Sequence, residues 1–332
     1  MNNVKKVLFL GIVLSIFLFI PQKAVCGAKN YRGKKILYIN SYHQGYYWSD
    51  GEQNAAQKSL SDTGVQFTIA YMDTKNNPSA EFSRRAGLKI KKLIQEFKPD
   101  VVIAADDTAF RYVIMPYYRN KPLPVVLCGI NWDLSPYGAP YKNTTGMLEI
   151  GLVESIYKHL RKIAKGNRVG LISFDSFGER KNAGYYRQYI DGEFIRVEFV
   201  KDFASWKQKF IEMQDKVDML IVADPSGIRN WNITQAEQFV LEHIRIPVGT
   251  ETISMIPIAL VGVTKVPEEQ GEYAARTALR ILDGEKPSDI PIVSNKKGNL
   301  YVNLKIANKL GVIFNPATLR SAKAVIGSGE KN

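Results

Sequence analysis

The stretch KILYINSYHQGYYWSDG, residues 35–51, decides the fold class of this chain. It begins with a short apolar run, which is typical of a buried β-strand, and ends in a polar and aromatic loop. The residues near 50–61 that follow predict a helix. A strand, a loop and a helix in that order form the repeating unit of a parallel sheet covered by helices. The stretch therefore predicts an α/β protein.

Strands and helices alternate through the rest of the chain in two series. The first series has strands at 35–41, 65–71, 100–105 and 124–129, with helices near 50–61, 79–97 and 107–118. The second series has strands at 168–174, 194–200, 218–223 and 246–250, with helices near 150–165, 179–191, 203–215 and 234–244. A stretch rich in Pro, Tyr, Gly and Asn, 131–146, lies between them and predicts a passage between lobes. We expect two doubly wound parallel-sheet lobes.

The N-terminal residues predict export. Residues 1–28 combine a basic start, an apolar run too short for a membrane span and small residues near the end, which is typical of a cleaved signal peptide. An uncleaved membrane anchor is the alternative. A lipid anchor on Cys26 is a further alternative, which Lys23 and Val25 disfavour. We expect a periplasmic or other extracytoplasmic location.

The composition excludes several classes of protein. The chain has 332 residues, 45% of them hydrophobic and 23% charged, which is typical of a globular protein with room for two cores. Its formal net charge is +13, but the lysines are spread over predicted helix faces, which favours a solvated surface and no nucleic-acid partner. The two cysteines, Cys26 and Cys128, allow no disulfide framework or cysteine metal site, and we expect Cys128 to be buried.

Motifs that carry catalytic chemistry are missing from the sequence. No G-x-G-x-x-G loop follows a strand, and neither a G-x-S-x-G elbow nor an H-E-x-x-H helix occurs. The three histidines, His43, His159 and His243, are scattered. We therefore expect a protein that is not an enzyme, with no catalytic residue, cofactor or metal.

Polar and aromatic residues follow the predicted strands, where ligands of open α/β sheets bind. The predicted ligand-binding residues are Ser41, Tyr42, His43, Trp48, Asp107, Thr108, Asn131, Asp175, Ser176, Asp224 and Glu251. Helix capping is an alternative role for Asp107, Thr108 and Ser176, and covering a helix end is one for Trp48. The acids favour a ligand with an amine, and the aromatic residues favour one with a flat or apolar part.

Several segments near the C-terminus carry a family resemblance. They are ALVGV at 259–263, EEQG at 268–271, ALRILDGEKP at 278–287, IPI at 290–292 and VNLKIANKLG at 302–311. With them the chain, from residue 36 to about 324, resembles the ABC transporter substrate-binding proteins of the tryptophan-binding-like group, which have the type I periplasmic binding fold. The resemblance implies lobes at 34–146 plus 262–288 and at 147–261 plus 289–325, joined by three crossings that act as a hinge.

The residues and the resemblance together predict a solute-binding protein of an ABC transporter. We expect a monomer that closes around a small polar or aromatic molecule, amino-acid-like or amine-bearing, and delivers it to a membrane permease. The segment 42–48 also resembles the ligand-binding halves of certain bacterial sensor kinases, so a periplasmic ligand-sensing adaptor for such a kinase is an alternative. An α/β hydrolase is a more distant alternative.

Overall fold

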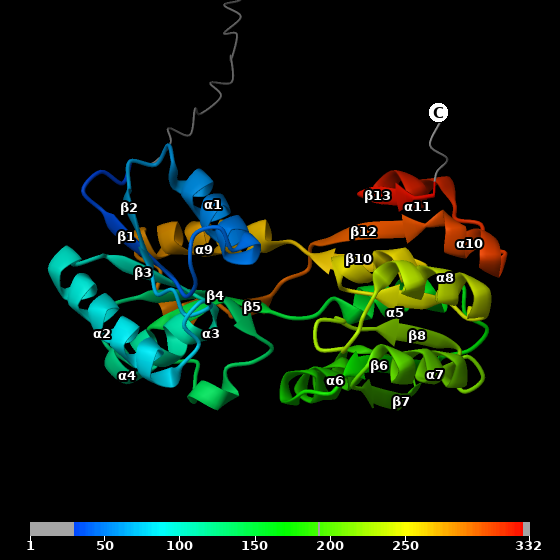
Figure 1. Ribbon diagram of the computed structural model, residues 1–332. Coiled ribbons are helices and arrows are strands. Elements are labelled where there is room, and N and C mark those ends of the chain that lie inside the picture. The colour runs from blue at the N-terminus through cyan, green and yellow to red at the C-terminus, as the bar shows by residue number, and fades with distance from the viewer. Residues whose placement is uncertain (1–29, 192, 328–332) are drawn as a thin grey trace, which may run out of the picture.

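Two β-sheets organise the chain, one in each of two lobes (Figure 1). This computed structural model describes residues 30–191 and 193–327. The expected signal peptide at 1–28 and Cys26 lie outside the described residues. No helix among the described residues is both long and apolar enough to cross a membrane.

The sheet of the first lobe is parallel throughout. In order across the sheet its strands are β2 (Gln66–Tyr71), β1 (Lys35–Asn40), β3 (Val101–Ala105), β4 (Val125–Asn131), β5 (Thr144–Glu149) and β11 (Val293–Ser294). Its central strands are apolar on both faces because helices cover both sides. Leu37 and Ile39 of β1 pack on one side, and Ile36 and Tyr38 pack on the other.

The sheet of the second lobe repeats this arrangement. In order its strands are β7 (Glu193–Val200), β6 (Arg168–Phe174), β8 (Met219–Val222), β9 (Val248–Thr250), β10 (Val261–Lys265), β12 (Gly298–Asn303) and β13 (Ala324–Ile326). Among the described residues of this sheet, only the β10–β12 pair is antiparallel. The order β7-β6-β8-β9-β10 matches β2-β1-β3-β4-β5 of the first lobe. This confirms two doubly wound, mainly parallel lobes with a shared architecture.

Helices cover both sheets. In the first lobe, α1 (Tyr47–Leu60) and α9 (Pro267–Leu282) lie on one face, while α2 (Ala80–Phe97), α3 (Asp106–Ala109), the π-helical turn Phe110–Ile114 and α4 (Met115–Tyr117) lie on the other. The second lobe contains α5 (Val153–Arg161), α6 (Phe177–Tyr189), α7 (Phe203–Met213), α8 (Ile233–His243), α10 (Leu304–Leu310) and α11 (Pro316–Ser321). Cys128 of β4 is fully buried, as the sequence predicts.

The chain passes between the lobes three times. It leaves the first sheet after Glu149, returns from the second after Lys265, and leaves the first again after Ser294. These points lie a few residues after the boundaries expected at 146, 261 and 288. The predicted passage 131–146 includes only the first three residues of β5, and the strand itself was not predicted. β5 begins with two buried threonines and a glycine, so it lacks the apolar run that marks the other strands.

The contact between α1 and α9 yields a test of the packing. A Cβ atom on Gly271 of α9 would lie 1.8 Å from the backbone oxygen of Glu52 in α1, whereas one on Gly184 of α6 would meet nothing within 4 Å. We expect Gly271→Ala to lower the free energy of unfolding by about 1–3 kcal/mol, because the helices must move apart. Gly184→Ala, the matched control, should raise it by about 0.5–1 kcal/mol. Urea unfolding of both variants checks this, and equal stability of Gly271→Ala and the native protein would contradict it.

Candidate functional site

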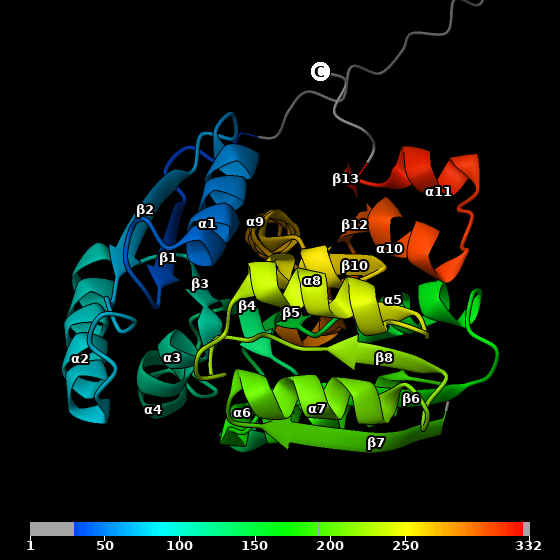
Figure 2. The same cartoon turned by 45° about the vertical axis from the view of Figure 1, so that its right-hand side comes forward.

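The strand order of each sheet marks the carboxyl ends of its strands as the place where a ligand would bind, and we call the region where these ends face the other lobe the crevice. In both sheets the chain adds its strands first toward one edge and then toward the other. The change lies between β1 and β3 in the first lobe and between β6 and β8 in the second. In open α/β sheets ligands bind outside the carboxyl ends at such a point. In Figure 2 the arrowheads of β7 and β8 point toward the side of the first lobe. The candidate site therefore lies where these ends meet the other lobe.

Tyr42, in the loop after β1, and Trp48, in the first turn of α1, each have an ammonium group beside the ring. The Tyr42 ring lies edge-on to Tyr46, with ring centroids 5.1 Å apart, and the Lys75 ammonium sits 4.9 Å from the Tyr42 centroid. The Lys265 ammonium lies 5.3 Å from the centroid of Trp48. The indole Nε1 of Trp48 is buried and has no hydrogen bond of ordinary geometry among the described residues. Both ammonium-to-centroid distances are within the range of cation–π interactions.

Other predicted residues of the first lobe contact residues of their own lobe. Ser41 is fully buried, and its hydroxyl donates to the Ala105 carbonyl at 2.6 Å and accepts from the Ala109 amide at 2.8 Å. It therefore joins β1 to β3 and α3. The His43 Nδ1 atom lies 3.7 Å from an Asp73 oxygen. Thr108 is half-buried in α3.

The adjacent acids at the end of β3 point to different neighbours. An Asp107 oxygen accepts from Asn131 Nδ2 at 2.8 Å, and the other accepts from the Tyr137 hydroxyl. Asp107 and Asn131 are therefore in direct contact. Asp106 instead points inward, with 2% of its surface exposed and a φ of 68°. A positive φ is costly for a residue other than glycine, so the backbone here is strained.

Behind the crevice, Asp106 meets a second buried acid, Glu52 of α1. Gly129 lies in an irregular part of β4 with a φ of 69°, and a Cβ there would be 2.8 Å from Glu52 Oε1 and 3.2 Å from Asp106 Oδ1. Both Glu52 oxygens and Asp106 Oδ2 are buried and have no hydrogen bond of ordinary geometry among the described residues, although Trp48 lies close enough to Glu52, and Tyr42 to Asp106, to lower the pKa of each acid. Burial, and next the negative charge of Asp106, raise the pKa of Glu52 well above its ordinary value.

The predicted residues of the second lobe divide in the same way. Asp175 accepts from Arg180 Nε at 2.9 Å, Ser176 caps α6 by accepting from the Glu179 amide at 3.1 Å, and Asp224 accepts from the Ser226 amide at 2.7 Å. These three contacts are local and stabilise the loops that follow β6 and β8.

Glu251 contacts residues well beyond its own loop. One of its oxygens accepts from the Tyr186 hydroxyl, and the other accepts from the Leu152 amide at 3.1 Å. Leu152 lies just after the first passage between the lobes.

An ion pair between Glu149 and Lys265 lies at the centre of the site. Glu149 ends β5 and Lys265 ends β10, so the pair joins two passages between the lobes. Burial raises the pKa of Glu149, Lys265 opposes this, and Asp107 and Glu251 add to the rise. Burial alone would lower the pKa of Lys265, but Glu149 and Glu251 raise it. Asp107 of the first lobe and Glu251 of the second therefore both contribute to the pKa of Glu149.

The third passage is tied to the other two. The Asn295 side chain accepts from the Ile150 amide at 2.6 Å and donates to the Ile150 carbonyl at 3.2 Å. Glu269, in the first turn of α9, accepts from the Lys297 amide at 2.8 Å and the Lys296 amide at 3.1 Å. Charged or amide side chains thus link every pair of passages.

The predicted ligand-binding residues leave out four residues of this region: Glu52, Asp106, Glu149 and Lys265. A signal existed for Glu52, because it shares one helical face with Ala56 and Leu60 at a spacing of four residues, and those two are buried. Asp106 directly follows β3 and Lys265 ends β10, so the expectation that ligands bind at strand ends could have selected both. Glu149 had none, because β5 was not predicted.

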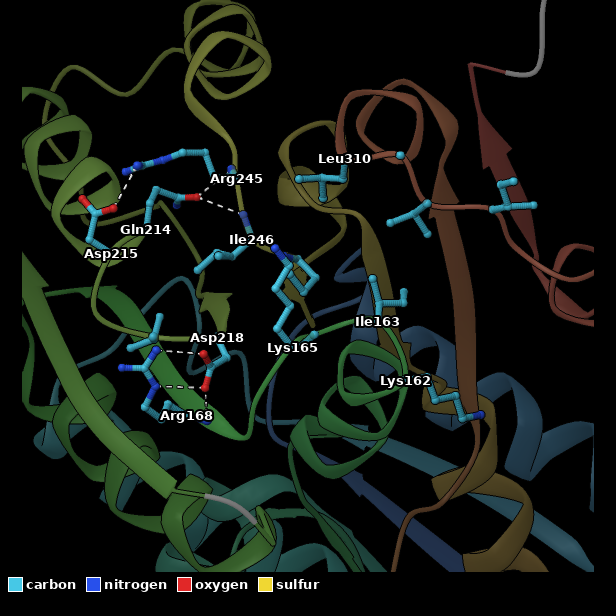
Figure 3. Close-up of a pocket in the computed structure, with 16 residues that line it drawn as sticks. Lys162, Ile163, Lys165, Arg168, Gln214, Asp215, Asp218, Arg245, Ile246 and Leu310 are labelled. Carbon is cyan, nitrogen blue, oxygen red and sulfur yellow. Dashed lines mark hydrogen bonds and ion pairs between the residues drawn. The ribbon is translucent and has the colours of Figure 1, made fainter.

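A hollow of about 600 Å³ lies elsewhere on the second lobe, beside the starts of β6, β8 and β9 (Figure 3). Its guanidinium groups are paired, Arg168 with Asp218 at 2.8 Å and Arg245 with Asp215 at 2.8 Å. None of its lining residues has a buried polar atom without a partner. Lying at the opposite strand ends, it is separate from the crevice.

The site offers recognition chemistry. Among residues 30–191 and 193–327, no group of three or more His, Cys, Asp or Glu is arranged to hold a metal ion. The site brings together carboxyl oxygens, aromatic faces and one ion pair. Carboxylates can bind a cationic group, and aromatic faces can bind a cation or a flat ring.

Solved structures share this fold. A ligand-free, open substrate-binding protein with adhesive properties from Clostridium difficile matches with TM-score 0.66 and 17% identity, over 88% of this chain and 99% of that chain. A periplasmic ribose ABC transporter from Conexibacter woesei matches with TM-score 0.56 and 14% identity, over 90% and 100%. The ABC domain from Streptococcus pneumonia in complex with L-Trp matches with TM-score 0.53 and 18% identity, over 88% and 99%. The fold is that of the type I periplasmic binding proteins.

The family follows from the sequence match. No curated protein matches the chain. These comparisons do not support a sensor-kinase adaptor. The family model described as "ABC transporter substrate binding protein" matches residues 49–326, so this chain belongs to the family of ABC transporter substrate-binding proteins.

Proposed function

We propose that this protein captures, outside the cytoplasmic membrane, a small molecule with a protonated amine and an aromatic or flat apolar part. The lobes close on it by bending at the three passages, and the protein delivers it as a monomer to the permease of an ABC transporter. The protein binds its solute without transforming it. Export relies on residues 1–28, which lie outside the described residues.

One observation supports a solute with an amine: carboxyl groups outnumber the ammonium groups around the crevice. Asp107 of the first lobe and Glu251 of the second both act on Glu149, which Lys265 already neutralises. Lys75 is the other cation in this region and lies near Asp106. A carboxylate removed from water is costly unless a cation approaches it. A cationic solute would supply that cation.

The aromatic part rests on Tyr42 and Trp48. Both are only partly buried, so each still has ring surface to offer at the crevice. Flat rings prefer stacked or edge-to-face contacts, and a bound ring would find both rings beside the acids. An amino acid or amine with an aromatic side chain combines these features.

We expect aromatic amines to stabilise the protein, and compounds of similar shape that carry a carboxylate in place of the ammonium group to leave it unchanged. The test compares tryptamine with indole-3-propionate and tyramine with 4-hydroxyphenylpropionate, by thermal unfolding. A compound at about 100 times its Kd should add about 2.7 kcal/mol to the free energy of unfolding. If only the carboxylates stabilised the protein, the amine proposal would be wrong.

Asp107→Asn should weaken binding of any amine found in this way. The variant keeps the shape of the side chain but removes its charge, and a hydrogen bond to a charged group contributes about 1.5–3 kcal/mol. The Kd, measured by calorimetry, should therefore rise roughly 10- to 100-fold. Glu96→Gln is the matched control, because Glu96 is 63% exposed on α2. Equal affinity of Asp107→Asn and Glu96→Gln would exclude a direct role for Asp107.

The buried acid Glu52 should make stability depend on pH. Its pKa in the folded protein is raised by burial, so the folded state binds more protons than the unfolded chain above pH ~4.3. The free energy of unfolding should therefore fall as the pH rises from about 4.3 toward the folded pKa. Glu52→Gln should show a smaller fall, because its side chain carries no charge.

Urea unfolding of both proteins between pH 5 and pH 8 measures this difference. Glu96→Gln should follow the native curve. Parallel curves for Glu52→Gln and the native protein would mean that Glu52 does not titrate differently in the folded state.

A further inference from the structure

Trp132 is a residue of the first lobe that is buried in the second. It follows β4 and is 7% exposed, and it packs in the second lobe's core with Leu152 and Tyr186. Its backbone has a φ of 65°, which a bulky side chain rarely adopts. The backbone amide of Trp132 donates to the Glu149 carbonyl at 3.0 Å, so this conformation is held beside the first passage.

The indole of Trp132 occupies a slot on α6. Its ring stacks on Tyr185 with centroids 4.8 Å apart and planes 2° apart, and lies 5.8 Å from both Tyr186 and Tyr189. Its Nε1 donates to the Asn182 side-chain oxygen at 2.9 Å. The slot thus offers a flat face, an edge and a hydrogen-bond acceptor, which are the three features that an indole needs.

The residues of the slot have partners of their own. Asn182 Nδ2 donates to Glu179 at 3.0 Å, which orients the amide oxygen toward the indole. The Tyr186 hydroxyl donates to Glu251. At the far edge Gly151 leaves room for the ring, since a Cβ there would be 3.1 Å from Trp132 Cη2. The hydrogen bonds of Asn182 and Tyr186 do not involve Trp132, so they can hold these two side chains in place when the indole leaves the slot.

We propose that this face of α6 is a binding site for an indole ring, and that Trp132 fills it as a plug that holds the two lobes together. The ring belongs to one lobe, and the residues that stack on it or bond to it, Asn182, Tyr185, Tyr186 and Tyr189, belong to α6 of the other, so separating the lobes must withdraw the indole. Asp133 strengthens the same contact by accepting from the Tyr185 hydroxyl. This inference does not depend on which solute the crevice captures.

Free indole tests the slot. Trp132→Ala should bind added indole, because the slot is then empty, whereas the native protein should not bind it there. At about ten times its Kd, indole should raise the Tm of Trp132→Ala by about 2–4 °C. 1-Methylindole has no N–H to donate to Asn182, so it should bind several-fold more weakly.

Two controls separate the slot from any space left by a missing ring. Trp231→Ala removes a partly buried tryptophan from the same lobe, whose ring packs edge-on against Phe203 and Trp206. This variant should not respond to indole. Trp132→Ala combined with Tyr185→Ala removes the stacking partner and should lose the response. Equal responses of Trp132→Ala and Trp231→Ala, or none from a folded Trp132→Ala, would overturn the binding site.

Lobe separation tests the plug. Trp132→Ala should increase the radius of gyration measured by X-ray scattering, and free indole should not reverse the increase, because it is not attached to the first lobe. Tyr185→Ala opens the slot without touching Trp132 and should have the same effect, which keeps the test valid if Trp132→Ala does not fold. An unchanged radius in the folded variants would overturn the plug.

Discussion

The buried ion pair of Glu149 and Lys265 is the interaction on which the relation between the two lobes depends. Each partner is the last residue of a strand, one in each sheet, so the pair fixes two passages between the lobes at one point. Removing one partner of a buried pair leaves an uncompensated charge and typically costs about 3–5 kcal/mol. The remaining passage is attached through Asn295 and Glu269, which bond to backbone groups.

The pair also sets the electrostatics of the crevice. Lys265 is committed to Glu149, so it cannot fully neutralise Asp107 or Glu251, which approach from opposite lobes. Glu52 and Asp106 lie behind it with oxygens that lack a hydrogen bond of ordinary geometry among the described residues. Such groups lower stability, and strained backbone at Asp106 adds to the cost. Burial first, and then nearby acids including Glu149, raise the pKa of both Glu52 and Asp106, so these unfavourable groups lie close to the ion pair.

Much of the fold was predictable because most strands carry an unmistakable pattern. The predicted runs at 35–41, 100–105 and 168–174 match β1, β3 and β6, since strands buried on both faces must be apolar throughout. The same rule explains the strand that was missed. β5 is buried through Thr144, Thr145 and Gly146, and Thr145 satisfies its hydroxyl by donating to the Ile290 carbonyl, a partner far away in the sequence.

The candidate site was predictable only in part. The expectation that ligands bind at strand ends selects Tyr42, Asp107, Asn131 and Glu251, whose binding role stays a prediction. It also selects Ser41 and Ser176, whose hydroxyls are used within their own lobes. It does not select Trp132, because nothing local shows that a ring after one strand will be buried against a helix of the other lobe.

The sequence by itself determined the α/β class, the two series of strands and the polar strand ends, because these depend on local periodicity and on burial along each strand. Tertiary structure alone decided which acids face one another, where Lys265 finds Glu149 and how Trp132 reaches α6. Those contacts join residues that are far apart in the chain, and they depend on how two separately folded sheets are set against each other.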